Sequence, residues 1–306
     1  MVKKLSFKSQ KIMSLFCVLC LITVSVQAAA LWPIPEGLKT VEVNGYPMAY
    51  QDTGRGTPLL LIHGSLADYR TWRKQVPVFS ESYHTVAVCL RHHYPEKWDG
   101  VCNDFAVDQH ASDVAALIKK LNLGKVHLIG HSRGGPVAFT VAKMHPELIR
   151  TIILEDGNID SILPETPEKQ ERAAAWKKRA EIACANLEAG NPEKAAQEWL
   201  DDYAGTPIWE KLPPPVKAII IDNVWSTTDT GDRGNISCDD ILKFNFSILL
   251  LNGEKSPKHY VDIYKELRKC RPDLPEPIVV PNAPHMMHGA NPEFYNSAVL
   301  EFLKER

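Results

Sequence analysis

The sequence predicts an α/β protein with a doubly wound, mostly parallel sheet and a helical cap inserted between two of its strands. Short apolar runs of strand length recur along the chain, and they are continuous rather than alternating. Such runs indicate strands buried on both faces, as in a parallel sheet covered by helices. Segments with helical periodicity lie between them, and one long stretch at residues 158–243 interrupts the alternation.

The N-terminus has the pattern of a targeting segment. Four lysines precede an apolar stretch at residues 12–26, and alanines follow at residues 28–30. This pattern predicts a cleaved signal peptide over residues 1–28 and a secreted or periplasmic protein. The apolar run is shorter than the roughly 20 residues that span a bilayer, so we expect no stable membrane insertion after cleavage. Anchoring by an uncleaved signal is the alternative.

Composition and charge limit the possible partners. The chain has 306 residues, of which 44% are hydrophobic and 24% charged, enough for one large domain with an insertion. The formal net charge is −2, and losing the four lysines of residues 1–28 makes it −6. There is no basic stripe of the kind that nucleic acid requires, so we expect a small-molecule partner and no nucleic acid. Oligomeric state cannot be read from these features.

Five cysteines follow the N-terminal segment: Cys89, Cys102, Cys184, Cys238 and Cys270. They show no paired CxxC spacing, so no zinc site is predicted. In an oxidising compartment Cys89 and Cys102, which lie in one strand-to-helix connection, could form a disulfide. Two unpaired thiols are the alternative, because the sequence does not supply the distance between their Cα atoms.

The predicted sheet begins with a β-hairpin at residues 39–52. Its turn contains Asn44-Gly45, a dipeptide that accepts positive φ. The apolar runs that follow are predicted strands at residues 58–62, 85–89, 126–129, 151–154, 248–251 and 278–280. Helices are predicted at residues 107–121, 136–145 and 292–304.

The stretch at residues 158–243 is predicted to be the helical cap, with residues 31–157 and 244–306 forming the core. It is rich in Glu, Lys and Ala and has helical segments at residues 167–189 and 192–203. Ligands of open α/β sheets bind beyond the carboxyl ends of the strands, where such an insertion would lie. The alternative is that these helices extend the main domain.

Gly130-His131-Ser132-Arg133-Gly134 matches the G-x-S-x-G pattern of a nucleophile elbow. A predicted strand precedes it and a predicted helix follows it, which is the setting that the motif requires. The chemistry needs the serine on a sharp turn with its hydroxyl exposed, and a side chain at either glycine would crowd the backbone. Ser132 is therefore the predicted nucleophile, and a structural serine in a tight turn is the alternative.

Two other segments supply partners for this serine. Ser65 follows the predicted strand at residues 58–62, and its backbone N–H is expected to form an oxyanion hole with that of Arg133. His285 lies between the last strand and the last helix and is the predicted general base, with His288 as its competitor. The chain order Ser, acid, His agrees with this kind of fold.

These residues together resemble the capped α/β-hydrolase family. The likeness is carried by TPLLLIHGSLADYRTW at residues 57–72, VHLIGHSRGG at residues 126–135 and the tail at residues 283–303, and it is poor in the cap. The family includes esterases, lactonases, C–C bond hydrolases, haloperoxidase-like enzymes, epoxide hydrolases and haloalkane dehalogenases. The last two use an aspartate nucleophile, so Ser132 argues against both.

The resemblance also bears on the base and the acid. Members commonly place the catalytic histidine seven residues before a Pro-Glu pair, so Pro292-Glu293 selects His285 over His288. Members usually carry Gly-x-x-Asp after the strand at residues 248–251, but here Ser256 occupies the place of the aspartate. Some relatives take the acid from the end of the preceding strand instead. The resemblance therefore ranks Glu155 first, then Asp156, then Glu254, as the carboxylate that orients the histidine tautomer.

The activity implied is hydrolysis of a small or medium carboxylic ester or lactone through an acyl-enzyme, without a metal or an organic cofactor. A C–C bond hydrolase or haloperoxidase-like activity on the same triad is one alternative. A non-catalytic ligand-binding receptor is the alternative of another class, and Ser256 at the usual acid position lends it weight.

Overall fold

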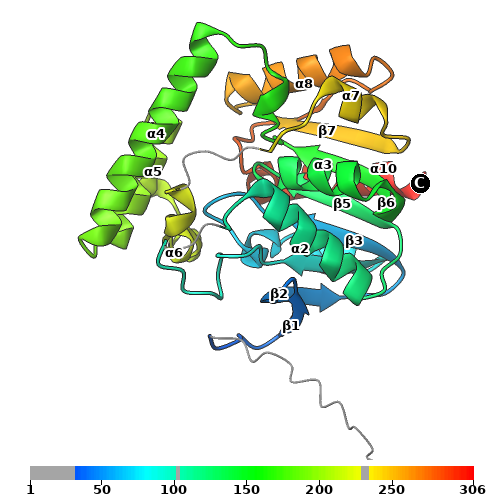
Figure 1. Cartoon of the computed structure of the whole chain (residues 1–306), viewed down its shortest axis with the longest axis horizontal. Helices are drawn as coiled ribbons and strands as arrows, with labels where there is room; N and C mark the ends of the chain where they lie inside the picture. The colour runs from blue at the N-terminus through cyan, green and yellow to red at the C-terminus, as the bar shows by residue number, and fades with distance from the viewer. Residues whose placement is uncertain (1–31, 101–103, 229–233) are drawn as a thin grey trace, which may run out of the picture.

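The computed structural model describes residues 32–100, 104–228 and 234–306. The predicted signal peptide lies outside these residues, as does Cys102. The described chain contains one eight-stranded sheet with the strand order β1-β2-β4-β3-β5-β6-β7-β8, which confirms the predicted fold class (Figure 1). The strands are β1 Leu38–Val43, β2 Tyr46–Thr53, β3 Thr57–Ile62, β4 Tyr83–Val88, β5 Val126–His131, β6 Ile149–Glu155, β7 Ser247–Gly253 and β8 Ile278–Val280.

The predicted hairpin is confirmed at the start of the sheet. β1 and β2 pair antiparallel, and the turn between them has positive φ at Asn44 (50°) and Gly45 (76°). β2 also pairs antiparallel with β4, whereas every later pairing is parallel. Because β3 lies between β4 and β5, the chain winds first to one side of β3 and then to the other. This switch brings the carboxyl ends of β3 and β5 together, which is where ligands of such sheets bind.

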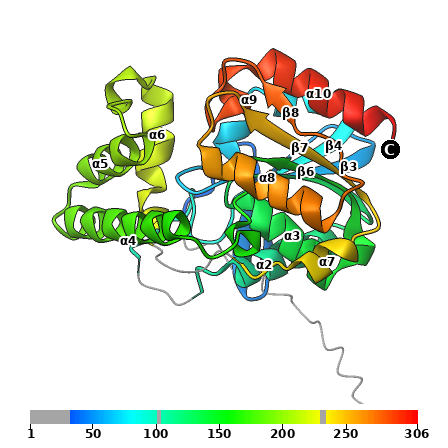
Figure 2. The same cartoon turned by 90° about the horizontal axis from the view of Figure 1, so that it is seen from above.

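Helices cover both faces of the sheet, as Figure 2 shows from above. One face carries α2 Val107–Lys120, α3 Gly134–Met144 and α8 Lys258–Cys270, whose buried side chains share one apolar cluster with the strands. The other face carries α1 Val76–Phe79 and α10 Pro292–Lys304, which belong to a second apolar cluster. The continuous apolar strands are thus buried on both sides, as their pattern predicts.

Between β6 and β7, the helices α4 Pro167–Glu188, α5 Pro192–Ala204 and α6 Pro214–Asp222 stand to one side of the sheet in Figure 1. They have an apolar cluster of their own, which includes Trp199 and Trp209 and also Leu66, from the loop after β3. The helical insertion therefore lies against the carboxyl edge of the sheet.

Two details of the insertion were not anticipated from the sequence. Pro213-Pro214-Pro215 ends one segment but also begins α6, because proline fits the first turn of a helix, where its missing N–H would have no helical partner. At the other end, α7 Cys238–Leu242 packs Ile241 into the cluster of the main sheet rather than into that of the insertion.

A disulfide joins Cys238 of α7 to Cys270 at the end of α8. The sequence did not indicate this pairing, because the two residues are 32 positions apart and belong to different helices. Cys89, the described member of the pairing considered above, is a buried free thiol, and Cys184 is also free. None of the helices in the described ranges is long and apolar enough to cross a membrane.

Candidate active site

Ser132 lies on the sharp turn between β5 and α3. Its φ is 50°, in the left-handed region that non-glycine residues rarely adopt, and such strain is typical of functional turns. The turn is attached to the end of β6, because the Ser132 N–H donates to the Glu155 carbonyl (3.0 Å) and the Asn158 N–H donates to the Ser132 carbonyl (3.0 Å). The side chain is left half-buried at the carboxyl edge of the sheet.

The two glycines of the motif are required by close backbone approach. A Cβ added to Gly130 would lie 2.4 Å from the Gly134 carbonyl oxygen, and one added to Gly134 would lie 2.3 Å from the Ile62 carbonyl oxygen. Both separations are far below a van der Waals contact. The turn can therefore be this tight only without side chains at these positions.

The loop after β3 runs directly beside the nucleophile. A Cβ added to Gly64 would lie only 2.8 Å from the Ser132 Cβ. The backbone just before Ser65 can therefore lie this close to Ser132 only because residue 64 has no side chain. The next residue, Leu66, donates its N–H to the Ser226 hydroxyl (3.0 Å) in the insertion. The loop that contains Ser65 thus runs beside Ser132, and Arg133 follows Ser132 directly in the chain. Their role as an oxyanion hole stays a prediction.

His285 is held by Asp156. The His285 Nδ1 lies 2.9 Å from the Asp156 Oδ2, and the carboxylate is buried. Two further donors bind the same carboxylate: the Asn252 amide at 2.8 Å and the Ser256 hydroxyl at 2.5 Å. This leaves the Nε2 of His285 as the ring nitrogen that faces away from the acid.

This arrangement corrects the expected order of the acids. Glu155 was ranked first, but its carboxylate bonds the His288 Nδ1 (2.5 Å) instead of His285. Asp156, ranked second, has a φ of 43°, so the chain turns at the end of β6 and directs consecutive carboxylates to different histidines. Glu254, ranked third, accepts the Asn282 N–H (2.6 Å) at an exposed position.

The geometry also explains Ser256. This residue stands where relatives carry aspartate, and it donates its hydroxyl to the carboxylate that Asp156 supplies from the neighbouring strand. The Ser256 hydroxyl therefore helps to hold the Asp156 carboxylate that contacts His285.

His288, the alternative base, is occupied at both ring nitrogens. Its Nδ1 bonds Glu155, and its Nε2 lies 2.8 Å from the hydroxyl of Thr71 in η1 Tyr69–Trp72. Gln75 donates to the His288 carbonyl oxygen (2.8 Å). The pair Glu155–His288 thus ties the loop that carries His285 to β6 and to the segment after β3.

Two tyrosines that the sequence reasoning did not single out lie over His285. The Tyr260 ring stacks on the imidazole, with ring centroids 4.6 Å apart and an interplanar angle of 11°. The Tyr260 hydroxyl lies 3.4 Å from the His285 Nε2 and 2.9 Å from the hydroxyl of Tyr203, in α5 of the insertion. No local signal distinguishes these tyrosines from packing residues, because their neighbours come from segments remote in sequence.

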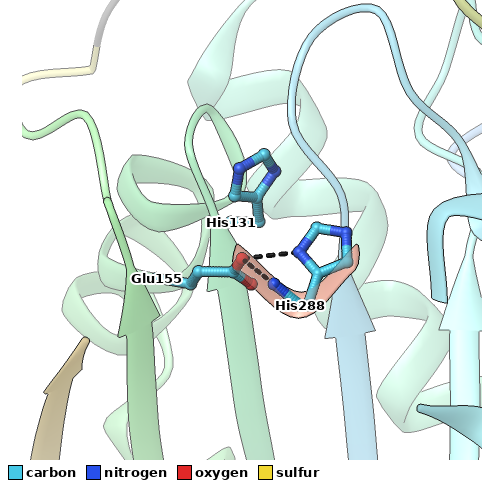
Figure 3. A group of neighbouring side chains, drawn as sticks. All are labelled: His131, Glu155 and His288. Atoms are coloured by element: carbon cyan, nitrogen blue, oxygen red, sulfur yellow. Dashed lines mark hydrogen bonds and ion pairs between the residues drawn. The ribbon is translucent and has the colours of Figure 1, made fainter. Parts of the chain in front are cut away.

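One group of side chains has the composition of a metal site. His131, Glu155 and His288 are buried, and each offers a ligand atom within 4.8 Å of the others. Figure 3 shows that Glu155 bonds only His288 within this group, through both its ring and its backbone N–H. The His131 Nε2 instead lies 3.2 Å from the His285 carbonyl oxygen. The group is therefore arranged as a hydrogen-bonded pair with a neighbouring ring.

Buried histidines surround the site and are held neutral. Burial lowers the pKa of His63 to about 4, and burial together with the nearby His285 and His288 lowers the pKa of His131 well below its ordinary value. Since neither ring gains a proton near neutral pH, they add no positive charge beside the nucleophile.

Fold and site together define a hydrolase. The alpha/beta hydrolase fold family matches residues 57–292, and the chain belongs to this family.

Several known proteins are similar to it. Over 273 residues the chain is 23% identical to a 2-(acetamidomethylene)succinate hydrolase from Mesorhizobium japonicum, covering 87% of this chain and 94% of that protein. It is 33% identical to a soluble epoxide hydrolase from Corynebacterium sp., but only over 114 residues, which are 37% of this chain and 39% of that enzyme. Among solved structures, an esterase from Thermogutta terrifontis matches with a TM-score of 0.64 and 22% identity, covering 88% of this chain and 98% of that one. These likenesses agree with the fold and with the family match, and they leave the substrate open.

Proposed function

We propose that this chain is a serine hydrolase that cleaves a small or medium carboxylic ester or lactone through an acyl-enzyme on Ser132. The observation that carries the proposal is the contact of His285 with Asp156 beside a strained elbow serine. A carboxylate on Nδ1 fixes the tautomer whose Nε2 can accept a proton, which is the orientation that nucleophilic serine chemistry needs.

The mechanism follows from these positions. The His285 Nε2 takes the proton of Ser132, and the serine oxygen attacks the substrate carbonyl. The N–H groups of Ser65 and Arg133 donate to the oxyanion. The C–O bond to the leaving group then breaks, and His285 returns its proton to the departing oxygen. A water molecule hydrolyses the acyl-enzyme with His285 again as base, while Asp156 holds the imidazole in place.

A fluorophosphonate probe tests the proposal, because it reacts covalently with an activated serine. We expect stoichiometric labelling of the wild-type protein and none of Ser132→Ala, with ester turnover lost in the same variant. Full labelling of Ser132→Ala would refute the role of this serine. Folded protein that neither labels nor turns over any ester would favour the ligand-binding receptor.

A panel of substrates separates the enzyme alternatives. We expect p-nitrophenyl esters of short and medium acyl chains, or lactones, to be hydrolysed. Turnover of ring-cleavage products without any ester turnover would instead favour a C–C bond hydrolase on the same three residues, and halogenation without hydrolysis would favour the haloperoxidase-like activity.

We also propose that the enzyme works outside the cytoplasm. The charged and apolar pattern of residues 1–28 predicts export, and the Cys238–Cys270 disulfide is typical of proteins in oxidising compartments. Mass spectrometry of the mature protein should show a chain that begins after Ala28 or Ala30. An intact N-terminus on protein recovered from the membrane fraction would support the anchored alternative.

A further inference from the structure

The Tyr260 hydroxyl lies among the reacting groups. It is 3.4 Å from the His285 Nε2, and the Ser132 side chain is near enough to lower the pKa of the phenol. One phenol oxygen therefore lies beside both groups that exchange a proton in the proposed reaction. Tyr260 is buried and comes from the first turn of α8, so the main domain itself places it there.

A second tyrosine, from the insertion, fixes this hydroxyl. The Tyr203 hydroxyl lies 2.9 Å from that of Tyr260. The Tyr203 ring is itself held by stacking on Trp199, with centroids 5.2 Å apart and an interplanar angle of 16°. Because the Tyr260 ring also stacks on His285, the phenol is constrained from both sides. Such restraint is what an oriented hydrogen-bond donor requires.

The position of the hydroxyl defines which substrate atom it can reach. In the proposed reaction the His285 Nε2 delivers its proton to the leaving-group oxygen, so that oxygen must come within hydrogen-bonding distance of Nε2. The predicted oxyanion site lies elsewhere, beside the loop of Gly64 and Ser65. A donor next to Nε2 is therefore on the leaving-group side of the scissile bond.

We infer that Tyr260 is a further catalytic residue, which donates a hydrogen bond to the leaving-group oxygen, and that Tyr203 is a positioning residue that acts through it. This inference rests on the proposed function. As the C–O bond breaks, the leaving oxygen takes the electron pair and receives the proton that His285 took from Ser132. Tyr260 keeps its own proton and lowers the energy of the charge that develops on this oxygen.

The protonation state of the phenol agrees with this role. Burial raises the pKa of Tyr260 well above its ordinary value, the neighbouring Tyr203 raises it further, and the nearby Ser132 side chain offsets part of the effect. The phenol thus remains a neutral donor across the range in which a histidine works as a base.

A series of esters with one acyl group and different leaving groups tests the inference. The quantity to measure is kcat/KM, because it reports the steps up to acylation. For Tyr260→Phe we expect a loss of about tenfold or more with an alkyl ester and of only about two- to threefold with the p-nitrophenyl ester. Nitrophenoxide needs little stabilisation, whereas an alkoxide needs much. Tyr203→Phe should show the same trend with a smaller amplitude.

Tyr264→Phe is the matched control. Tyr264 lies one turn further along α8 and is buried, but its hydroxyl accepts the Gly157 N–H (3.0 Å) and donates to the Leu154 carbonyl (2.9 Å). Its loss should lower the melting temperature and change kcat/KM equally for every ester. If the loss of kcat/KM in Tyr260→Phe were the same for every leaving group, as is expected for Tyr264→Phe, the inference would be overturned.

The two proposals fail in different ways. If Ser132→Ala abolishes probe labelling and turnover but Tyr260→Phe shows no dependence on the leaving group, only the role of Tyr260 is refuted. If Ser132→Ala still labels and turns over esters, the proposed function falls, and the inference falls with it.

Discussion

At the scale of single residues, the buried Asp156 carboxylate is the centre of the contacts that hold His285. Asp156 accepts hydrogen bonds from Asn252 and Ser256 in addition to its contact with His285. Several donors on one buried carboxylate fix its position, and a fixed carboxylate on Nδ1 can orient an imidazole. The Ser256 hydroxyl thus helps to fix the carboxylate that contacts His285.

Replacing Asp156 with Asn should identify it as the orienting acid. The amide keeps the shape but cannot hold the required tautomer of His285, so we expect kcat to fall by about 10⁴. The measurement is kcat for the best ester of the panel, with the fold checked by circular dichroism.

Glu155→Gln is the comparison within the same pair of neighbouring carboxylates. Since Glu155 bonds His288 in the interior, its loss should lower the free energy of unfolding by about 1–3 kcal/mol and leave kcat within about tenfold of the wild type. A larger loss of kcat in Glu155→Gln than in Asp156→Asn would show that the first-ranked acid is the correct one.

At the scale of elements, helix α8 contributes both to the candidate site and to the stability of the fold. Its first turn carries Tyr260, and its last residue, Cys270, is joined to Cys238 of α7. The disulfide closes a loop with a sequence separation of 32 residues, and loop closure of this length disfavours the unfolded chain.

Removing this disulfide should destabilise the protein. For the double variant Cys238→Ser/Cys270→Ser we expect the free energy of unfolding to fall by about 3–4 kcal/mol. Urea denaturation with and without reductant measures this loss, and reductant should destabilise the wild type but not the double variant. Cys184→Ser is the control, because Cys184 is a free thiol on α4. Equal urea midpoints for the wild type and the double variant would contradict the expectation.

At the scale of the whole molecule, buried histidines make stability depend on pH. Burial lowers the pKa of His63 to about 4, and it is the largest cause that lowers those of His93 and His110 well below the ordinary value. An unfolded histidine has its ordinary pKa of about 6.5, so between about pH 6.5 and pH 4 the unfolded chain binds more protons than the folded one. The contribution of these neutral histidines to the free energy of unfolding is therefore fully present above pH 6.5, and it is lost as the pH falls toward 4.

His110 offers a test of this dependence. Neither of its ring nitrogens has a hydrogen-bond partner within the described ranges, so His110→Leu removes a titrating group without breaking a bond. We expect the free energy of unfolding of the wild type to fall from pH 6.5 to pH 4.5, and that of the variant to fall less steeply, by about one proton's contribution. Parallel curves for the two proteins over this range would show that His110 does not contribute.

Much of the architecture follows from local pattern. The hairpin, the six apolar strands and the helices at residues 107–121 and 292–304 were predicted within a few residues of their observed bounds. The elbow was predictable for the same reason, because its strand, glycines and helix are consecutive in sequence. His285 could be singled out by its place between the last strand and the last helix.

The sequence alone thus determined which segments become strands and helices, and which serine and histidine have the setting for nucleophilic chemistry. Only the tertiary structure decided that Asp156 rather than Glu155 contacts His285, that Cys238 pairs with Cys270, and that two tyrosines from different helices meet over the imidazole. Periodicity reports which side of its own strand or helix a residue faces. Contacts between side chains many residues apart depend on how whole elements pack, and no local pattern encodes that packing.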